Sequence, residues 1–410
     1  MGNHHTHDGN CLELGRRKFL TMAAAGAGLV MLPIGQALAA RNEIVIGGTL
    51  AQSGPLAGAT KPFVALANAW AKRVNNAGGI YLKKLGKKLP IRFIFYDDQT
   101  SPPQALKLYE RLATVDKVDV FIGPFSSFLT NAALQASLTH HIPFFMVEAN
   151  DEVLFEKPNP WRTTGLAPAK TEYSRTVPLF KDRADLKSVA LLGRENLHER
   201  QSVEGAAQGF RDLGMQVVYD KLAPANTKDF SSVVLAMKEQ NPDVVLVEAL
   251  PPPWIIGFLK QARELGLNPK EVVAGHVGVP VIKAMGKSGN NIVSFTYYFE
   301  GNTPDHKELY AISHAAGVEP WMYPEIGLRY RAFRRIKDAL EHAGSLDKEA
   351  IREAMWKQKL HLYGEETIEY DKRGYGTDIP YPNEILGGKM VSLWPLDKGR
   401  RMHKPKNGMW

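Results

Sequence analysis

Residues 118–138 read VDVFIGPFSSFLTNAALQASL, and this stretch decides the fold. The mostly apolar run 118–122 is typical of a strand buried on both faces, and 127–138 is typical of a helix. Gly123-Pro124 interrupts both patterns, so the strand passes into the helix across a short loop. The unpaired N–H groups of the first helical turn then lie beyond the carboxyl end of the strand, where an acceptor group of a ligand can bind.

The same alternation of short β-branched runs and longer helical segments recurs along the chain. Strands are predicted at 44–49, 91–96, 118–122 and 144–147, and helices at 63–75, 103–115 and 127–138. After Arg162 the pattern restarts, with strands at 188–192, 216–219, 244–247 and 272–274 and helices at 200–213, 230–239 and 254–265. Such alternation predicts an α/β fold with two doubly wound parallel-sheet lobes. Ligands of such sheets bind beyond the carboxyl ends of the strands.

Length and charge are those of an ordinary two-lobed globular protein. Of 410 residues, 51 are Lys or Arg and 43 are Asp or Glu, which gives a formal net charge of +8. Charges of both signs are spread along the chain, and no basic run with interleaved aromatic residues occurs. The pattern is typical of a solvated surface and gives no indication of nucleic-acid binding. The chain is too long for one small core and suits two lobes.

The first 39 residues have the features of an export signal. Gly15-Arg16-Arg17-Lys18-Phe19-Leu20 precedes an Ala- and Gly-rich apolar run that ends at Ala37-Leu38-Ala39. The paired arginines resemble the twin-arginine class, so we expect cleavage near Ala39 and a periplasmic protein. The alternative is a membrane anchor, but the apolar run is shorter than the roughly 20 residues that span a bilayer. Cleavage would also remove Cys11, the only cysteine, so no disulfide is expected.

The sequence lacks the residue patterns of common enzymes and metal sites. It contains no Gly-x-Ser-x-Gly motif, no Walker loop and no dinucleotide glycine fingerprint. His140 and His141 are adjacent, so on a helix their side chains diverge, and no His or Cys pair beyond the leader has ligand spacing. We therefore expect a protein that is not an enzyme and has no metal ion, nucleotide or other cofactor.

Several loop motifs recur in a fixed order over nearly the whole chain after the leader. They are Ser53-Gly54-Pro55, Asn75-Asn76-Ala77-Gly78-Gly79-Ile80, Tyr96-Asp97-Asp98-Gln99, Phe121-Ile122-Gly123-Pro124, Arg162-Thr163-Thr164-Gly165, Lys228-Asp229-Phe230-Ser231 and Gln261-Ala262-Arg263-Glu264-Leu265-Gly266. Together they resemble the type I periplasmic solute-binding proteins of ABC transporters, especially the branched-chain amino acid and amide group. Each motif alone is weak, and their common order makes the resemblance specific.

The resemblance implies two lobes joined by three crossing strands that close like a hinge on a small solute. The crossings are expected near Thr164, near Thr296 and at 383–389. Lobe 1 would then comprise 41–165 plus 297–385, and lobe 2 would comprise 166–296 plus 386–410. The resemblance also implies a monomer that presents its solute to a membrane permease with a cytosolic ATPase.

In lobe 1 the resemblance places the ligand site at two loops. Ser127 matches the family serine that holds a ligand carboxylate, with Ser126 beside it and Phe125 lining the pocket; alternatively, one of the serines simply caps the helix. Ala149 falls where family members bind the head group through backbone atoms, and Asp151 falls where they have a hydroxyl. Because Asp151 and Glu148 would repel a ligand carboxylate, the alternative is that Asp151 caps the next helix and Glu148 pairs with a lysine or arginine.

In lobe 2 the chain departs from the amino acid binders. Val277 falls where they have a glutamate that pairs with the ligand ammonium, and leaving that ammonium unpaired would cost several kcal/mol. His198 falls near a family aromatic that packs on the ligand, and His276 precedes Val277. The alternative for each histidine is an ordinary loop residue.

Aromatic residues are further candidates for the pocket wall. Trp254, which opens a predicted helix, either covers the pocket or is packed in the core. Tyr297 and Tyr298, near the second crossing, form either an aromatic wall or hinge packing.

These residues predict a solute-binding component of an ABC importer whose ligand is not an ordinary α-amino acid. Candidate solutes are an amide or urea-like compound, an aromatic or aliphatic carboxylic acid, and a small polar alcohol or amine. The alternative function is a ligand-sensing periplasmic module that reports to a membrane receptor or regulator. Permease and ATPase genes beside the gene would favour transport, and a histidine kinase gene would favour sensing.

Overall fold

The computed structural model describes residues 41–364 and 366–394. The predicted signal peptide, with Arg16, Arg17 and Cys11, lies outside the described residues, as does the basic end of the chain from Lys398. Among the helices that are described, none has both the length and the apolar character needed to cross a bilayer.

The first sheet has five parallel strands in the order β4-β1-β5-β6-β7. They are β1 (Ile44–Leu50), β4 (Ile91–Asp97), β5 (Val120–Ile122), β6 (Phe144–Met146) and β7 (Arg162–Thr164). Gly47 and Gly48 of β1 pair with Phe121 and Ile122 of β5. An added Cβ at Gly48 would lie 2.5 Å from the Ile122 carbonyl oxygen, so glycine permits this close packing of strands.

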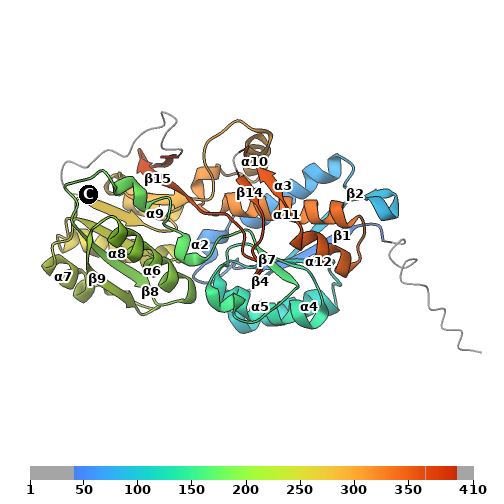
Figure 1. Ribbon diagram of the computed structural model, residues 1–410, viewed down its shortest axis with the longest axis horizontal. Helices are drawn as coiled ribbons and strands as arrows, with labels where there is room; N and C mark the ends of the chain where they lie inside the picture. The colour runs from blue at the N-terminus through green and yellow to red at the C-terminus, as the bar shows by residue number, and fades with distance from the viewer. Residues whose placement is uncertain (1–40, 365, 395–410) are drawn as a thin grey trace, which may run out of the picture. The chain divides into compact units, whose positions relative to one another are not determined.

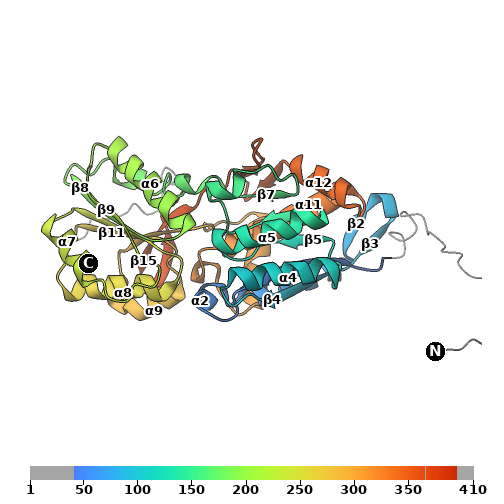
Figure 2. The same ribbon diagram turned by 90° about the horizontal axis from the view of Figure 1, so that it is seen from below.

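Helices cover both faces of the first sheet (Figures 1 and 2). They are α3 (Phe63–Asn76), α4 (Pro102–Thr114), α5 (Ser127–His140), α10 (Pro304–Ala315), α11 (Ile326–Ala343) and α12 (Lys348–Trp356), with the single turn α2 (Ala57–Thr60) near the start. α4 packs on α5 and β1, whereas α3 packs on β4, α10 and α11. Two small antiparallel hairpins, β2 (Ile80–Leu82) with β3 (Lys87–Leu89) and β13 (Leu360–Leu362) with β14 (Glu366–Ile368), complete this region.

The second sheet has seven strands in the order β16-β15-β12-β11-β10-β8-β9. They are β8 (Ser188–Arg194), β9 (Gln216–Ala223), β10 (Val244–Glu248), β11 (Glu271–Ala274), β12 (Val293–Thr296), β15 (Tyr381–Leu386) and β16 (Lys389–Ser392). The strands β8 to β12 are parallel, and β15 and β16 add an antiparallel edge. The helices around it, green to yellow in Figure 1, are α6 (Leu197–Asp212), α7 (Ser231–Glu239), α8 (Pro252–Glu264) and α9 (Val279–Met285).

The chain passes between the two sheets three times, as the resemblance implies. It leaves β7 for β8, leaves β12 for α11, which packs on β6, and returns to β15. β15 already pairs with β12 from Tyr381 onward, so the third passage ends before residue 381, earlier than the expected crossing at 383–389. The strand β15 (Tyr381–Leu386), most of which was predicted in lobe 1, lies in the second sheet. The other lobe boundaries remain predictions.

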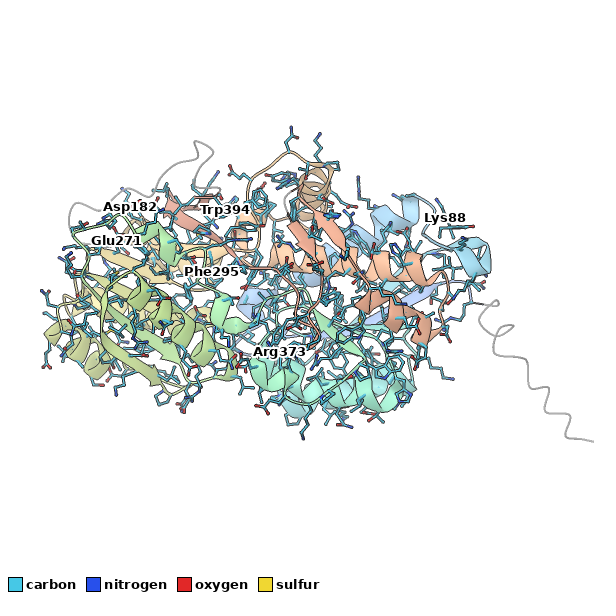
Figure 3. All side chains as sticks on the ribbon, in the orientation of Figure 1. Lys88, Asp182, Glu271, Phe295, Arg373 and Trp394 are labelled. Carbon is cyan, nitrogen blue, oxygen red and sulfur yellow. The ribbon has the colours of Figure 1, made fainter. Side chains whose placement is uncertain are left out.

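Each sheet has its own apolar core. The second sheet packs Val245, Val247 and their neighbours against Phe258 and Leu259 of α8, and the first packs Phe121 and Phe144 against α4 and α5. Phe295 of β12, labelled in Figure 3, is fully buried and its ring contacts the rings of Tyr173 and His276. The second core therefore extends to the loops beyond the strands.

Candidate functional site

A small cleft lies where loops beyond the carboxyl ends of strands in both sheets meet. It is lined by Phe125, Glu148, Asn150, Leu166, His198, Leu250, His276, Tyr297, Glu325 and Leu328. Its free volume is about 10 Å³, roughly the space of one water molecule. A solute of several heavy atoms therefore enters only if the cleft opens. Five candidate residues of the sequence analysis are in this lining: Phe125, Glu148, His198, His276 and Tyr297.

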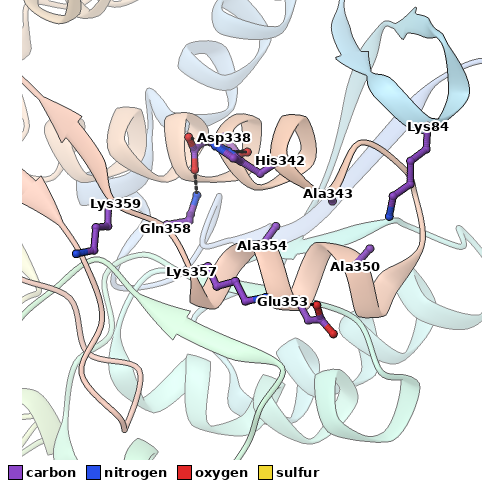
Figure 4. Close-up of a pocket in the computed structure, with 10 residues that line it drawn as sticks. All are labelled: Lys84, Asp338, His342, Ala343, Ala350, Glu353, Ala354, Lys357, Gln358 and Lys359. Carbon is purple, nitrogen blue, oxygen red and sulfur yellow. Dashed lines mark hydrogen bonds and ion pairs between the residues drawn. The ribbon is translucent and has the colours of Figure 1, made fainter.

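Larger grooves exist elsewhere, on helix surfaces. One of about 520 Å³ lies between α11 and α12, where Gln358 Nε2 donates to Asp338 Oδ2 at 2.8 Å (Figure 4). Another of about 670 Å³ lies between α3 and α10. The side chains that line both grooves are mostly those of exposed lysines, alanines and acidic residues. We assign the site to the smaller cleft because buried polar groups from several elements converge only there among these three cavities.

Glu148 faces the cleft and is paired with an arginine. Its Oε2 accepts from Arg329 Nη2 at 2.5 Å, and Arg329 Nη1 donates to the Gly123 carbonyl at 2.9 Å. Burial raises the pKa of Glu148 to about 8, although Arg329 opposes the shift. The other oxygen, Oε1, is buried without a hydrogen bond. The pairing of Glu148 with a basic residue was one of the two predicted alternatives.

The serines and Asp151 have local roles. Ser127 Oγ accepts from the backbone N–H groups of Asn150 and Asp151 at 3.3 and 3.4 Å, so it fixes the loop after β6 and does not line the cleft. Ser126 has a φ of +90° and a buried hydroxyl without a hydrogen bond. Asp151 Oδ1 accepts from Val153 N at 3.2 Å and caps the short turn Glu152–Phe155, and burial raises the pKa of Asp151 to about 6.

Four other predicted residues lie away from the cleft lining. Ala149 is buried in a small apolar cluster of the first sheet, and Val277 and Trp254 are buried in the core of the second. The hydroxyl of Tyr298 bonds to that of Tyr310, while Tyr297 lines the cleft. Ala149, Val277 and Trp254 are apolar and gain more from burial in a core than from a polar cleft. Tyr297 and Tyr298 diverge because the side chains of consecutive residues in extended backbone point in opposite directions.

His198 belongs to a buried network with Glu172. Its Nε2 lies 3.0 Å from Glu172 Oε2, and its Nδ1 lies 3.2 Å from Asn150 Oδ1. Glu172 also accepts from the hydroxyls of Ser202 and Tyr297, at 2.6 and 2.9 Å. Burial alone would lower the pKa of His198, but Glu172 raises it to about 9; conversely, His198 overcomes burial and lowers the pKa of Glu172 to about 2.

His276 contacts two more buried carboxylates. Its backbone has a φ of +50°, its Nδ1 lies 2.8 Å from Glu325 Oε1, and its Nε2 lies 3.2 Å from Glu248 Oε1. Tyr173 donates its hydroxyl to the other oxygen of Glu248. Burial would lower the pKa of His276, but the carboxylates raise it well above its ordinary value. Burial raises the pKa of Glu248.

The sequence reasoning missed most of the polar groups in this region. Glu248 had a usable signal, because it ends the otherwise apolar strand β10 and a charge at that position points beyond the sheet. Glu172, Glu325 and Arg329 had none, since they lie outside the loops that follow strands and meet the cleft only through the fold. Asn150 lies between the predicted Ala149 and Asp151. The assembled groups can bind a polar molecule or an ion.

Comparison with known proteins agrees with this architecture. A model of the periplasmic binding protein family matches residues 43–370. Leu/Ile/Val-binding protein homolog 7 of Brucella suis biovar 1 (strain 1330) is 24% identical over 384 residues, which cover 87% of this chain and 92% of that relative. Leu/Ile/Val-binding protein homolog 8 of Brucella abortus (strain 2308) is 28% identical over 233 residues, covering 54% and 55% of the two chains.

Solved structures share the fold at low sequence identity. The leucine binding protein LivK from Thermotoga maritima MSB8 superposes with a TM-score of 0.73 at 18% identity, covering 89% of this chain and 98% of that one. A solute binding protein from R. palustris in complex with 4-hydroxybenzoate gives 0.72 at 20% identity, with 90% and 98% covered. The chain therefore belongs to the periplasmic binding protein family: it has the type I fold and is a solute-binding protein of the kind that serves ABC transporters.

Proposed function

We propose that the protein is the extracytoplasmic component of an ABC importer and captures a small organic solute that is not an ordinary α-amino acid. It hands the solute to a membrane permease driven by a cytosolic ATPase. The family as a whole binds solutes and does not transform them, which supports a carrier. The twin-arginine route and the monomeric state are parts of the same proposal.

The observation that carries the proposal is the set of buried polar atoms without a partner around the cleft. Glu148 Oε1 and Arg329 Nε are buried and make no hydrogen bond. An unsatisfied buried polar group costs about 1–3 kcal/mol, and folded proteins contain few of them. A solute that bonds to these atoms would remove that cost, so they favour a ligand at this position.

The two residues that would recognise a zwitterionic head group support the exclusion of α-amino acids. The Ser127 hydroxyl accepts from two backbone N–H groups of the loop after β6 and does not line the cleft. Val277 is fully buried in the second core and offers no charge to an ammonium. The carboxylates of Glu172 and Glu325 lie nearby, but both already bond to histidines.

Two solute classes are favoured by different observations. The unpartnered oxygen of Glu148 favours an amide, urea-like compound, alcohol or amine, since these donate hydrogen bonds. Arg329, whose Nε is also unpartnered, and the rings of Phe125 and Tyr297 favour a carboxylic acid, especially an aromatic one. The R. palustris solute binding proteins of similar fold were solved with benzoate and 4-hydroxybenzoate.

A thermal-shift screen of the purified protein tests the proposal, because a ligand that binds only the folded form raises the melting temperature. The panel would contain acetamide, urea, benzoate, 4-hydroxybenzoate, succinate, glycerol, methylamine and leucine. We expect a shift with one class and none with leucine; micromolar binding of leucine would contradict the exclusion of amino acids.

Cleft and surface variants locate the binding. Phe125→Ala should abolish the shift, whereas Lys357→Ala, in the groove between α11 and α12, should leave it unchanged. Conversion of any panel compound into a product would show an enzyme and refute the carrier.

A further inference from the structure

Four buried side chains, two of which line the cleft, bring potential metal ligands together. Glu172, His198, Glu248 and His276 each offer one ligand atom, and these atoms all lie within 4.8 Å of one another. His276 Nε2 is 3.2 Å from Glu248 Oε1 and 3.6 Å from Glu172 Oε1, and His198 Nε2 is 3.0 Å from Glu172 Oε2. Ligands about 2.1 Å from a tetrahedral ion are separated by about 3.4 Å. The cluster therefore already has nearly the spacing of a coordination shell.

The imidazole orientations suit metal binding. His276 Nδ1 faces Glu325 Oε1, an acceptor, and His198 Nδ1 faces Asn150 Oδ1. The Asn150 amide orientation is fixed because its Nδ2 donates to the Ala167 carbonyl at 2.7 Å. Both histidines can therefore keep a proton on Nδ1 and present the lone pair of Nε2 to the cluster. A carboxylate or amide oxygen behind each ligating imidazole is the usual second layer of a metal site.

The carboxylates are held in a similar way. Glu172 accepts from the hydroxyls of Ser202 and Tyr297, and Glu248 accepts from that of Tyr173. These bonds fix the direction of each carboxylate.

Two of the four candidate ligand atoms pair with each other as ions without forming a well-aligned hydrogen bond. Glu248 Oε1 and His276 Nε2 are buried and make no hydrogen bond, although they lie only 3.2 Å apart. Glu248 is fully buried, and His276 is more than nine-tenths buried. A cation between them would satisfy both atoms at once.

Charge and donor chemistry define the class of ion. Two carboxylates neutralise one divalent cation, which makes burial of the complex electrostatically acceptable. Two imidazole nitrogens disfavour Mg²⁺ and Ca²⁺, which prefer oxygen ligands, and the mixed set suits first-row transition metals. We propose that Glu172, His198, Glu248 and His276 bind one divalent transition-metal ion of the zinc class in the wall of the cleft.

The proposal concerns the same cleft as the proposed function but does not require any particular solute. The competing arrangement is a metal-free network in which each histidine carries a second proton and pairs with the carboxylates. That network has the same net charge, so charge alone does not separate the two arrangements. Metal binding separates them, because the network would give no binding at the cleft.

Isothermal titration with zinc chloride tests the proposal on full-length protein stripped with EDTA. We expect one ion bound per chain at the cleft, not displaced by millimolar Mg²⁺ or Ca²⁺. Glu248→Gln, which keeps an acceptor for Tyr173, and His198→Gln should each weaken this binding at least 100-fold. Glu325→Gln, which acts through His276, should weaken it about 10–100-fold. The matched control Glu353→Gln alters an exposed carboxylate on α12 and should change nothing.

The outcomes are distinct. His4, His5 and His7 near the N-terminus can bind zinc themselves, so the decisive comparison is between wild type and the cluster variants. If wild type binds no more zinc, and no more tightly, than Glu248→Gln and His198→Gln do, the proposal is overturned, provided that circular dichroism shows the variants to be folded. A protein that binds a panel solute after EDTA treatment but no zinc at the cleft would refute only the metal site. One that binds zinc but no panel solute would refute the solute class alone.

Discussion

Gly327→Ala is the substitution whose effect the structure defines most sharply. Gly327 is the second residue of α11, and a Cβ added there would lie 1.7 Å from the Tyr297 carbonyl oxygen. Because real Cβ contacts are essentially never under 3.0 Å, α11 and the end of β12 must move apart by about 1.3 Å, from 1.7 to 3.0 Å between the added Cβ and the Tyr297 carbonyl oxygen. The separation would stretch the bonds from Tyr297 N to the Pro324 carbonyl and from Arg331 Nη1 to the Tyr297 carbonyl.

The expected net effect is a loss of about 3 kcal/mol in the free energy of unfolding. Overpacking costs about 1–3 kcal/mol, and each weakened hydrogen bond costs about 1 kcal/mol. The higher helix propensity of alanine returns about 1 kcal/mol. Urea unfolding followed by circular dichroism gives the change as a shift in midpoint at constant slope.

Gly58→Ala is the matched control. An added Cβ at Gly58, in α2, would meet only two proline carbons at 3.9 Å, which is ordinary contact. We expect its stability to stay within about 1 kcal/mol of wild type. If Gly327→Ala is as stable as wild type, α11 does not approach Tyr297 as described, and the placement of the Tyr297 side chain in the cleft loses its support.

Three further predictions concern the cleft and the first sheet. Arg329→Met should cost about 2–4 kcal/mol because it leaves two buried acceptors, the Gly123 carbonyl and Glu148 Oε2, without their donor. Urea unfolding should show a much smaller loss for Glu148→Gln, whose amide oxygen still accepts. Burial raises the pKa of Asp119 to about 6, above its value of about 3.9 in the unfolded chain. The contribution of Asp119 to the free energy of unfolding is therefore greatest below about pH 4, and it falls by about 3 kcal/mol as the pH rises from 4 through 6. Urea unfolding of Asp119→Asn between pH 4 and 7 should lack this fall. Tyr297→Phe removes the hydroxyl that donates to Glu172 Oε1 beside the cleft. Loss of this bond, which orients Glu172, should weaken the binding of any solute found in the screen about 5- to 10-fold by calorimetry, the equivalent of one hydrogen bond. An equal effect of Tyr298→Phe would contradict the assignment of Tyr297 to the cleft.

The fold was accessible from the sequence because its signals are local. Buried parallel strands are short apolar runs, and the run at 118–122 appears as β5 at Val120–Ile122 followed directly by α5. The small hairpins at β2–β3 and β13–β14 were not predicted, since strands of only three residues have almost no period to detect.

The site was only partly accessible, for a physical reason. Residues that follow a strand, such as Phe125, Glu148 and His276, were found because the carboxyl ends of strands meet at one edge of a sheet. Side chains that reach the cleft from other elements, such as Glu172 and Arg329, were not found. Their positions depend on packing between segments far apart in the sequence, and a single sequence does not record it.

Asn150 connects the two halves of the cleft in a way that bears on solute release. Its Nδ2 bonds to Ala167 in the passage between the sheets, and its Oδ1 meets His198 on α6. When the halves part, the second contact must break, and water then hydrates both exposed atoms and offsets most of the lost energy. The Asn150 amide would thus resist opening of the cleft only weakly, as the proposed carrier would need in order to release its solute.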